Sequence, residues 1–415
     1  MKETGIKDMD WEYSRETYSD DCTAQERFNR TEEILDFANM VFSVAYGGTD
    51  FGWLLPKAYA PQRSGLPIHH MIRSRGRGRI RALIDLYPLD LQLRGRPDRI
   101  RAVYVGTVAV HPNDTGRGYM TALMQRAVAD ARRQGCALMI LDGARHRYQY
   151  FGFERAGIRY DFHIETNNIE HSYAKLCMKD TTFCFQELEE GSPYLDRLYG
   201  LYCNRLVTAR SRGDFWLSLQ SYNASAYAVL RCGEPVGYVC LSEDRRSLTE
   251  FEIMESGDLC GVLHDLMESF ELGQLRVSVG MDETDKIEQL EYVCNSCSAS
   301  TSHQIRILDY EAALAFLMNW KRQYAAPATG EYVVGIRDAQ EGCIENYLLS
   351  VTEDKASVTR TEREADTVFD GMELIRILTT PLCFVQPQRG LGNKIKNAPA
   401  GWFPLPFYLP EADTF

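Results

Sequence analysis

The sequence lacks long apolar runs and has no excess of basic residues. Among its 415 residues, no run of eighteen apolar side chains occurs, and we therefore expect no transmembrane helix. Residues Met1–Trp11 contain no apolar core of a signal peptide. Basic residues number 46 against 58 acidic ones, which gives a formal net charge of −12. We expect a cytoplasmic protein without membrane or nucleic-acid partners, because nucleic acid is usually bound by a basic surface.

The sequence also lacks a recognisable metal motif. Its 12 cysteines are scattered through apolar segments, as expected of free thiols in a reducing compartment. Cys294 and Cys297 form a lone C-x-x-C without a second pair or nearby histidines, and we predict no metal site. The negative charge would suit a cationic substrate such as an amine, but solubility explains it equally well.

One stretch combines a strand, a glycine loop and a helix. Residues 105–118 are typical of a strand that runs into a loop containing Gly116 and Gly118. Apolar residues at helical spacing predict a helix over Tyr119–Arg133. A strand over Cys136–Leu141 follows, which gives the order strand, loop, helix, strand.

The loop has the chemistry of an anion site. Glycines allow a ligand to approach the backbone closely, and the free N–H groups at a helix start favour phosphate. Arg117 adds a positive charge between the two glycines. A G-x-G pair alone is weak evidence, and a turn without a ligand is an equally good interpretation. Thr121 replaces the third glycine of a dinucleotide fingerprint, and the Gly-Lys-Ser/Thr of a P-loop is missing.

The residues around the loop resemble the core motif of the GNAT acetyltransferases. The resemblance rests on Val108-Ala-Val-His-Pro112, Gly-Arg-Gly and Met120-x-x-Leu-Met124. It implies that the strand backbone pairs with the pantetheine arm of acetyl-CoA and that the loop amides hold the pyrophosphate. Thr115 and Met120 depart from the family pattern, but the binding groups are backbone amides. The cofactor-binding residues implied are Val108, Ala109, Val110, Gly116, Arg117, Gly118, Tyr119, Met120, Thr121, Gly143 and Ala144.

A second resemblance concerns the whole layout. Arg147-Tyr-Gln-Tyr-Phe-Gly-Phe153, the length and the terminal Phe415 are similar to those of the Eis (enhanced intracellular survival) acetyltransferases. The resemblance implies an α/β (α+β) fold with two tandem GNAT-like mixed-sheet domains, residues 1–165 and 166–304. A sterol-carrier-protein-like α+β domain, residues 305–415, would follow, and the implied assembly is a homohexamer. Residues 255–259 replace the glycine loop in the second copy, and we interpret that copy as degenerate.

The same resemblance assigns two catalytic roles. Tyr148 would be the general acid, and the C-terminal carboxylate of Phe415 the general base. From the residues alone, Tyr148 could belong to a packed aromatic cluster, and Phe415 could be a frayed end. Glu154 and Asp161 could serve as the base instead.

Three further element predictions concern less distinctive stretches. A helix is predicted over Thr31–Phe42 with Thr31 as its N-cap. A strand is predicted over His171–Cys177, and a helix over Val368–Leu378.

Taken together, the sequence predicts an N-acetyltransferase that uses acetyl-CoA. The acceptor would be a primary amine of a small cationic molecule, such as an aminoglycoside or polyamine, or a lysine side chain. The alternative is a non-catalytic protein that binds CoA or lipid and works through its C-terminal domain.

Overall fold

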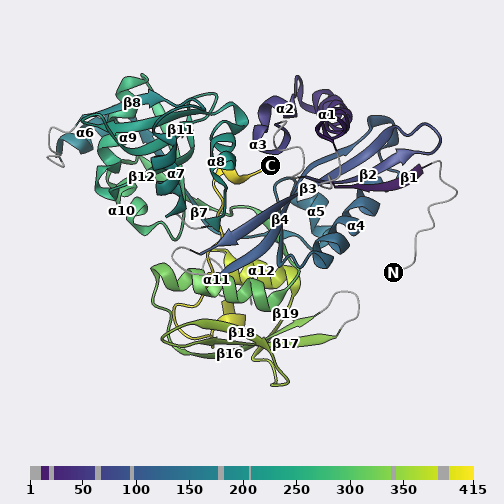
Figure 1. Ribbon diagram of the computed structural model, residues 1–415. Helices are drawn as coiled ribbons and strands as arrows, with labels where there is room; N and C mark the ends of the chain where they lie inside the picture. The colour runs from purple at the N-terminus through teal and green to yellow at the C-terminus, as the bar shows by residue number, and fades with distance from the viewer. Residues whose placement is uncertain are drawn as a thin grey trace.

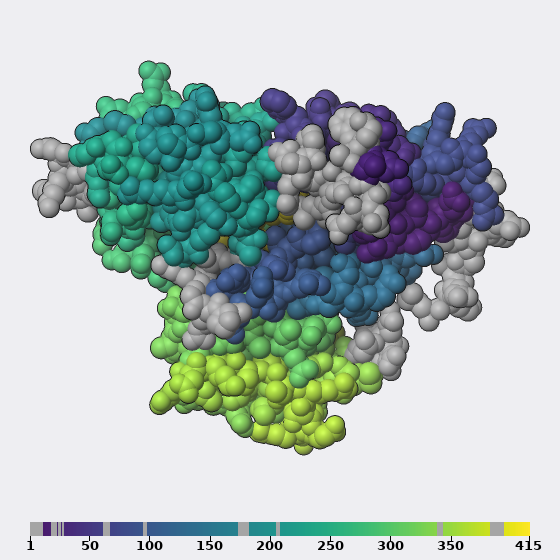
Figure 2. Space-filling model, viewed as in Figure 1, coloured from purple at the N-terminus to yellow at the C-terminus, as the bar shows by residue number. Residues whose placement is uncertain are grey.

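The chain folds around three sheets, which Figure 2 shows as three lobes. The computed structural model describes residues 11–17, 23–60, 67–93, 98–175, 182–204, 207–337, 343–381 and 392–415. Within these ranges, no helix combines the length and the apolar character needed to cross a bilayer. The chain combines three sheets with helices throughout its length, which confirms the predicted α/β fold class.

The first sheet has the strand order β1-β2-β3-β4-β5-β15-β6, and β9 pairs with β3. Helices α1 (Ala24–Tyr46), α2 (Phe51–Leu54) and α3 (Pro56–Tyr59) pack into the core on one face of this sheet, and α4 (Tyr119–Arg133) on the other. The strands are β1 (Trp11–Glu16), β2 (Ile68–Ser74), β3 (Ile80–Gln92), β4 (Arg99–Val110), β5 (Leu138–Leu141), β6 (Glu154–Arg155), β9 (Val207–Thr208) and β15 (Gln304–Ile307).

The second sheet has the strand order β14-β7-β13-β12-β11-β10-β8. As in the first sheet, an antiparallel meander ends in a strand that pairs parallel to its neighbour: β12 with β13, as β4 with β5. The strands are β7 (Arg159–Glu165), β8 (Phe183–Glu187), β10 (Ser225–Arg231), β11 (Glu234–Leu241), β12 (Ser247–Ile253), β13 (Gln274–Gly280) and β14 (Ser296–Ser300). The helices are α6 (Thr166–Lys175), α7 (Leu195–Cys203), α8 (Arg212–Leu219), α9 (Leu259–Ser269) and α10 (Thr284–Val293).

The third sheet is a small one with the order β18-β17-β16-β19. Its strands are β16 (Gly330–Arg337), β17 (Ile344–Val351), β18 (Ala356–Arg360) and β19 (Thr367–Asp370). Helices α11 (Tyr310–Tyr324) and α12 (Gly371–Thr379) lie between this sheet and the first one (Figure 1). One cluster of buried apolar side chains joins the third sheet to the face of the first sheet that lies opposite α4.

Strand pairing crosses two of the predicted domain boundaries. β7 falls within predicted domain 1–165 but pairs in the second sheet, and β15, at residues 304–307, returns to the first. The boundaries themselves stay a prediction.

Three element predictions were wrong in part. Helix α1 begins at Ala24, because Thr23 and Glu26 form a capping box, and Thr31 is buried inside the helix. Residues 171–175 of the predicted strand lie in α6, and residues 176–177 lie outside the described ranges. The predicted helix over residues 368–378 starts at Gly371, where Asp370 caps it, and is preceded by β19.

The C-terminal tail, residues 402–415, contacts all three units, each of which consists of one sheet and the helices and loops around it. The indole Nε1 of Trp402 donates to Ala328 O before β16 at 2.7 Å, and the Tyr408 hydroxyl donates to Ser278 O in β13 at 3.1 Å. His303, which precedes β15, contacts Leu409 O through Nε2 at 3.1 Å. The tail is therefore fixed along its length by side chains that are far apart in the sequence.

Replacing Gly157 with alanine should displace the tail. Gly157 has φ +76°, and an added Cβ would lie 2.8 Å from the carbonyl carbon of Phe407 and closer still to its oxygen. Gly135 has a similar φ of +71° but nothing within 4 Å. We expect Gly135→Ala to cost about 1 kcal/mol of unfolding free energy in urea, and Gly157→Ala about 3 kcal/mol or more. Equal costs would mean that the close contact between Gly157 and the tail does not contribute to the free energy of unfolding.

Candidate active site

The edge of β4 is open beyond its pairing with β5. The two strands pair from Ala102 to Tyr104 only, whereas β4 continues to Val110. Its other edge is paired with β3 up to Val110. Alternate residues of a strand turn their N–H and C=O groups to opposite edges. Because His111 N–H donates to Arg81 O in β3, the groups of Val108 and Val110 face away from β3, and those of Ala109 face it. This is the edge at which the GNAT resemblance places the pantetheine arm.

A bulge in β4 lies at Thr107, which has a φ of +48°. Its hydroxyl contacts the hydroxyls of Tyr59 at 2.8 Å and Tyr87 at 2.7 Å. Tyr59 also donates to Asp85 at 2.7 Å, and Asp85 bonds His69 at 2.6 Å. Burial raises the pKa of both tyrosines well above the usual value, and so both stay protonated. This buried network holds a backbone conformation that a threonine rarely adopts.

The glycine loop has the conformation that its sequence predicts. Gly116 and Gly118 have φ values of +82° and +78°, and α4 starts after Gly118 without a side-chain cap. Buried Asp114 accepts from Arg81 Nε at 2.5 Å and lies 3.2 Å from Arg117. Two guanidinium groups thus share one carboxylate, which leaves the loop net positive. Tyr119, Met120 and Thr121 form the first turn of α4, where free N–H groups favour an anion.

Tyr148 ends α5 (Arg145–Tyr148), directly beyond β5. Its ring covers Gly143, where an added Cβ would lie 2.8 Å from the ring, and packs edge-on against Phe153 at 6.3 Å. Ala144 precedes the helix. Burial raises the pKa of Tyr148, although the charge of Arg147 lowers it. Tyr148 is thus part of an aromatic contact and lies over Gly143, just after the end of β5.

Phe415 is not frayed. Its ring stacks on Tyr87 with centroids 4.4 Å apart and lies 5.7 Å from Tyr104. Its main-chain oxygen would lie 3.1 Å from a Cβ added at Gly106, the residue before the bulge. The main-chain oxygen of Phe415 therefore lies against β4 at Gly106, where an added Cβ would also come within 2.9 Å of the Tyr87 ring.

The two predicted catalytic residues pack on opposite faces of the first sheet. Phe415 belongs to the apolar cluster that contains Tyr87 and Tyr104, whereas Tyr148 belongs to the cluster formed with α4. The open edge of β4 lies between these faces. A substrate at that edge would be accessible from both.

An ion pair and a set of hydrogen bonds from a lysine hold the end of the tail. Asp413 accepts from Arg210 Nε at 2.7 Å and from Thr208 at 2.8 Å, and Arg210 also bonds both oxygens of Glu250, at 3.1 and 2.7 Å. Burial disfavours the charge of Arg210, but Asp413 and Glu250 outweigh it and raise its pKa. Lys57 Nζ donates to the carbonyls of Ala412, at 2.8 Å, and Thr414. The tail end thus lies between α3 and α8 (Figure 1).

A third anchor is formed by His303. Its Nδ1 lies 3.0 Å from both oxygens of Asp142, which also accepts from the Tyr104 hydroxyl at 2.8 Å. Burial would raise the pKa of Asp142, but the bonds from His303 and Tyr104 lower it overall.

The alternative bases are engaged elsewhere. Glu154 is 2% exposed and bonds Arg145 Nε at 2.6 Å. Asp161 lies in the second sheet, where it accepts from Ser278 at 2.6 Å and from Arg159 at 3.1 Å. Neither carboxylate lies on β4. Sequence reasoning missed Lys57, Arg210 and the network at Thr107, because their partners lie far away in the sequence and leave no local pattern.

Cavities flank the tail on both sides. One of about 390 Å³ is lined by Lys57, Arg210 and Phe415 among others, and one of about 350 Å³ by Asp142, His303 and Thr414 among others. A further cavity of about 430 Å³ lies at the end of β12 and β13, the counterpart of the β4–β5 opening. Its lining includes the acids Glu252, Glu255, Asp282, Glu283 and Asp285.

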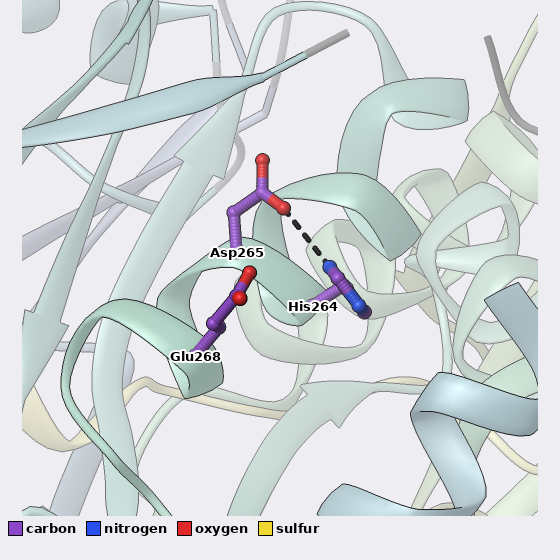
Figure 3. Close-up of side chains that lie close together, drawn as sticks. All are labelled: His264, Asp265 and Glu268. Carbon is purple, nitrogen blue, oxygen red and sulfur yellow. Dashed lines mark hydrogen bonds and ion pairs between the residues drawn. The ribbon is translucent and has the colours of Figure 1, made fainter. Parts of the chain in front are cut away.

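A group of potential metal ligands lies far from this site, on α9. Figure 3 shows His264, Asp265 and Glu268, whose ligand atoms lie within 4.8 Å of one another. One oxygen of Asp265 contacts His264 at 2.9 Å, and the other accepts the backbone N–H of Phe183 at 2.7 Å. Both oxygens are engaged within the protein, and Asp265 thereby joins α9 to β8.

Replacing Arg210 should leave two buried carboxylates unpaired. We expect Arg210→Met to lower the free energy of unfolding in urea by about 3 to 5 kcal/mol. Arg212 is the matched control, because it pairs with Asp196 at 2.6 Å while both side chains are well exposed. Arg212→Met should cost about 1 kcal/mol or less. Similar costs for both variants would show that Arg210 does not stabilise the tail.

Residues 30–156 match the model of an acetyltransferase (GNAT) domain. No curated protein matches the chain in sequence. The fold is similar to that of a GCN5-related N-acetyltransferase from Kribbella flavida, with 16% identity and a TM-score of 0.66 over 98% of this chain and 99% of that one. A GCN5-related N-acetyltransferase from Anabaena variabilis is similar as well, with 14% identity and a TM-score of 0.66 over 97% of this chain and 100% of that one.

Eis1 from Mycobacterium abscessus is also similar, with 17% identity and a TM-score of 0.61 over 97% of this chain and 100% of that one. At such identities the likeness shows the fold alone, and it agrees with the first two sheets as GNAT-like units. Residues 30–156 therefore carry a GNAT acetyltransferase domain, in a chain that shares its α/β fold with acetyltransferases over almost its whole length.

Proposed function

We propose that the protein transfers an acetyl group from acetyl-CoA to a primary amine. The open edge of β4, the glycine loop and the uncapped start of α4 support binding of the donor. The observation that carries the proposal is the position of the terminal carboxyl group at Gly106, beside the bulge in β4. In this position it can receive an amine from the face opposite α4.

The proton transfers follow from this arrangement. The Phe415 carboxylate takes a proton from the acceptor ammonium, whose pKa is near 10 in water. The free amine then attacks the thioester carbonyl, and the bond to sulfur breaks. Tyr148, kept protonated by burial, gives a proton to the leaving thiolate. The nitrogen loses its second proton as the amide forms, and this proton restores the Tyr148 phenol. The carboxylate releases the first proton to solvent, and the products are the amide and free CoA.

The acceptor is proposed to be a small cationic amine, such as an aminoglycoside or polyamine, or a lysine side chain. The net charge of −12 favours cations in general. The second unit is proposed to be degenerate, because five acids against one lysine, Lys286, line the cavity at the end of β12, and this excess of negative charge would repel a pyrophosphate. A homohexamer and a sterol-carrier-like third unit remain proposals based on the resemblance to the Eis type, and a cytoplasmic location remains a proposal from the sequence composition.

The alternative, a non-catalytic lipid- or CoA-binding protein, has less support. The third unit packs fully buried side chains such as Trp320, Leu349 and Phe369 into the cluster that it shares with the first sheet. Nothing in the described parts of this unit, residues 305–337, 343–381 and 392–415, points to a lipid.

Moving the terminal carboxylate should abolish turnover. One glycine added after Phe415 keeps the ring and displaces the charge, and we expect thiol release from acetyl-CoA to fall by about 10² or more. Deletion of Phe415 should have the same effect, whereas Phe415→Leu, which keeps the carboxylate, should retain most activity. The assay uses a panel of polyamines, aminoglycosides and lysine peptides. Full turnover by the glycine-extended protein would refute the base assignment.

Removing the Tyr148 hydroxyl should slow the chemistry without weakening donor binding. Tyr148→Phe keeps the contacts with Gly143 and Phe153, and we expect kcat to fall by about 10² to 10³ while acetyl-CoA binding is unchanged. Tyr150, whose side chain is 82% exposed, is the control, and Tyr150→Phe should behave like the wild type. An unchanged kcat for Tyr148→Phe would remove its role as the acid.

A further inference from the structure

Lys57 is buried at the point where the chain ends. It is 3% exposed, although lysine side chains are rarely buried without a partner. It lies on α3, between the first sheet and α8 of the second unit. Its Nζ donates to the carbonyl of Ala412, at 2.8 Å, and to that of Thr414. The same nitrogen lies 4.5 Å from the centre of the Phe415 ring and 5.3 Å from that of Tyr222.

These contacts fix the last part of the backbone. The carbonyl of Thr414 belongs to the final peptide bond of the chain, and it is followed only by Phe415 with its carboxylate. Arg210 holds the tail one step earlier, through the side chain of Asp413. Lys57 therefore orients the peptide plane from which the terminal carboxylate projects, while Arg210 fixes the segment before it.

The electrostatic surroundings of Lys57 are consistent with an amine that serves here as a hydrogen-bond donor. Burial lowers the pKa of Lys57 to about 7, against the opposing effects of Asp413, Glu250 and Glu411, while Arg210 lowers it further. A neutral amine still has two N–H donors, and both carbonyls can therefore be satisfied whether or not the amine is charged.

We propose that Lys57 is a positioning residue that holds the C-terminal carboxylate over β4 by binding the carbonyls of Ala412 and Thr414. The proposal rests on the function proposed above, in which this carboxylate is the base. In this proposal Lys57 takes no part in the proton transfers. Its loss should release the end of the tail rather than unfold the protein.

Digestion by carboxypeptidase A tests the proposal without requiring turnover. The protease must bind several extended residues, and so it can remove Phe415 only after the tail end has detached from the protein. We expect full-length Lys57→Met, which keeps the apolar stem, to release phenylalanine about tenfold to a hundredfold faster than the wild type. Release at the wild-type rate would overturn the proposal.

A matched control separates this role from the effect of losing any buried lysine. Lys321 in α11 is 8% exposed, its pKa is lowered by burial, and its Nζ lies 5.1 Å from the Tyr324 ring. Lys321→Met should leave phenylalanine release unchanged. If it accelerates release as much as Lys57→Met, the effect is general destabilisation and the proposal fails.

Steady-state kinetics give the second readout. Lys57→Met should lower kcat by about tenfold or more and leave the KM for acetyl-CoA unchanged, since the donor edge of β4 is not touched. Should this variant not fold, Lys57→Gln replaces it, because the shorter amide cannot reach both carbonyls. Faster release from the glutamine variant would support the proposal, and release at the wild-type rate would again refute it.

The results distinguish this proposal from the assignment of the base. If the glycine-extended protein is fully active, the base assignment fails, yet faster release from Lys57→Met still establishes the anchor. If the glycine extension abolishes turnover but release is unchanged in Lys57→Met, the base stands and the anchor is wrong.

Discussion

The buried ion pairs between Arg210, Asp413 and Glu250 determine where the chain ends. A charge removed from water is costly unless partners compensate it, and here each oxygen of Asp413 has a donor within 2.8 Å. Shifting the tail by one residue would place another side chain opposite Arg210 and leave three charges poorly paired. The network therefore selects a single register for residues 411–415. The position of the terminal carboxylate follows from it.

A terminal carboxylate is an unusual catalytic group, and its surroundings explain how it could act. Its ordinary pKa of about 3.5 makes it a weak base in water. The rings of Tyr87 and Tyr104 lie against the Phe415 ring, and Lys57 binds the carbonyls of Ala412 and Thr414 just before it. In the proposed function these contacts hold the carboxylate beside the acceptor amine, and this fixed position offsets its weak basicity.

How much the sequence revealed depended on the range of the interactions involved. The helix over Tyr119–Arg133 was predicted to the residue, because its apolar spacing and the glycines before it are local signals. The N-cap of α1 was missed although Thr23 and Glu26 form a capping box with local spacing. Lys57 could not be found in this way: its partners lie more than 350 positions away, and only the folded chain brings them together.

The second sheet also helps to position the tail, although the cavity at the end of its strands β12 and β13 is lined by acids. It contributes Glu250 from β12 and Ser278 from β13, and the segment between α7 and α8 contributes Thr208 and Arg210. All four groups contact Arg210 or the tail. The second sheet, which shares with the first an antiparallel meander that ends in a parallel pair, thus serves as the framework that holds the tail against the first sheet. In the proposed function this sheet acts on the site indirectly, because it fixes the segment that brings the main-chain oxygen of Phe415 to Gly106 in β4.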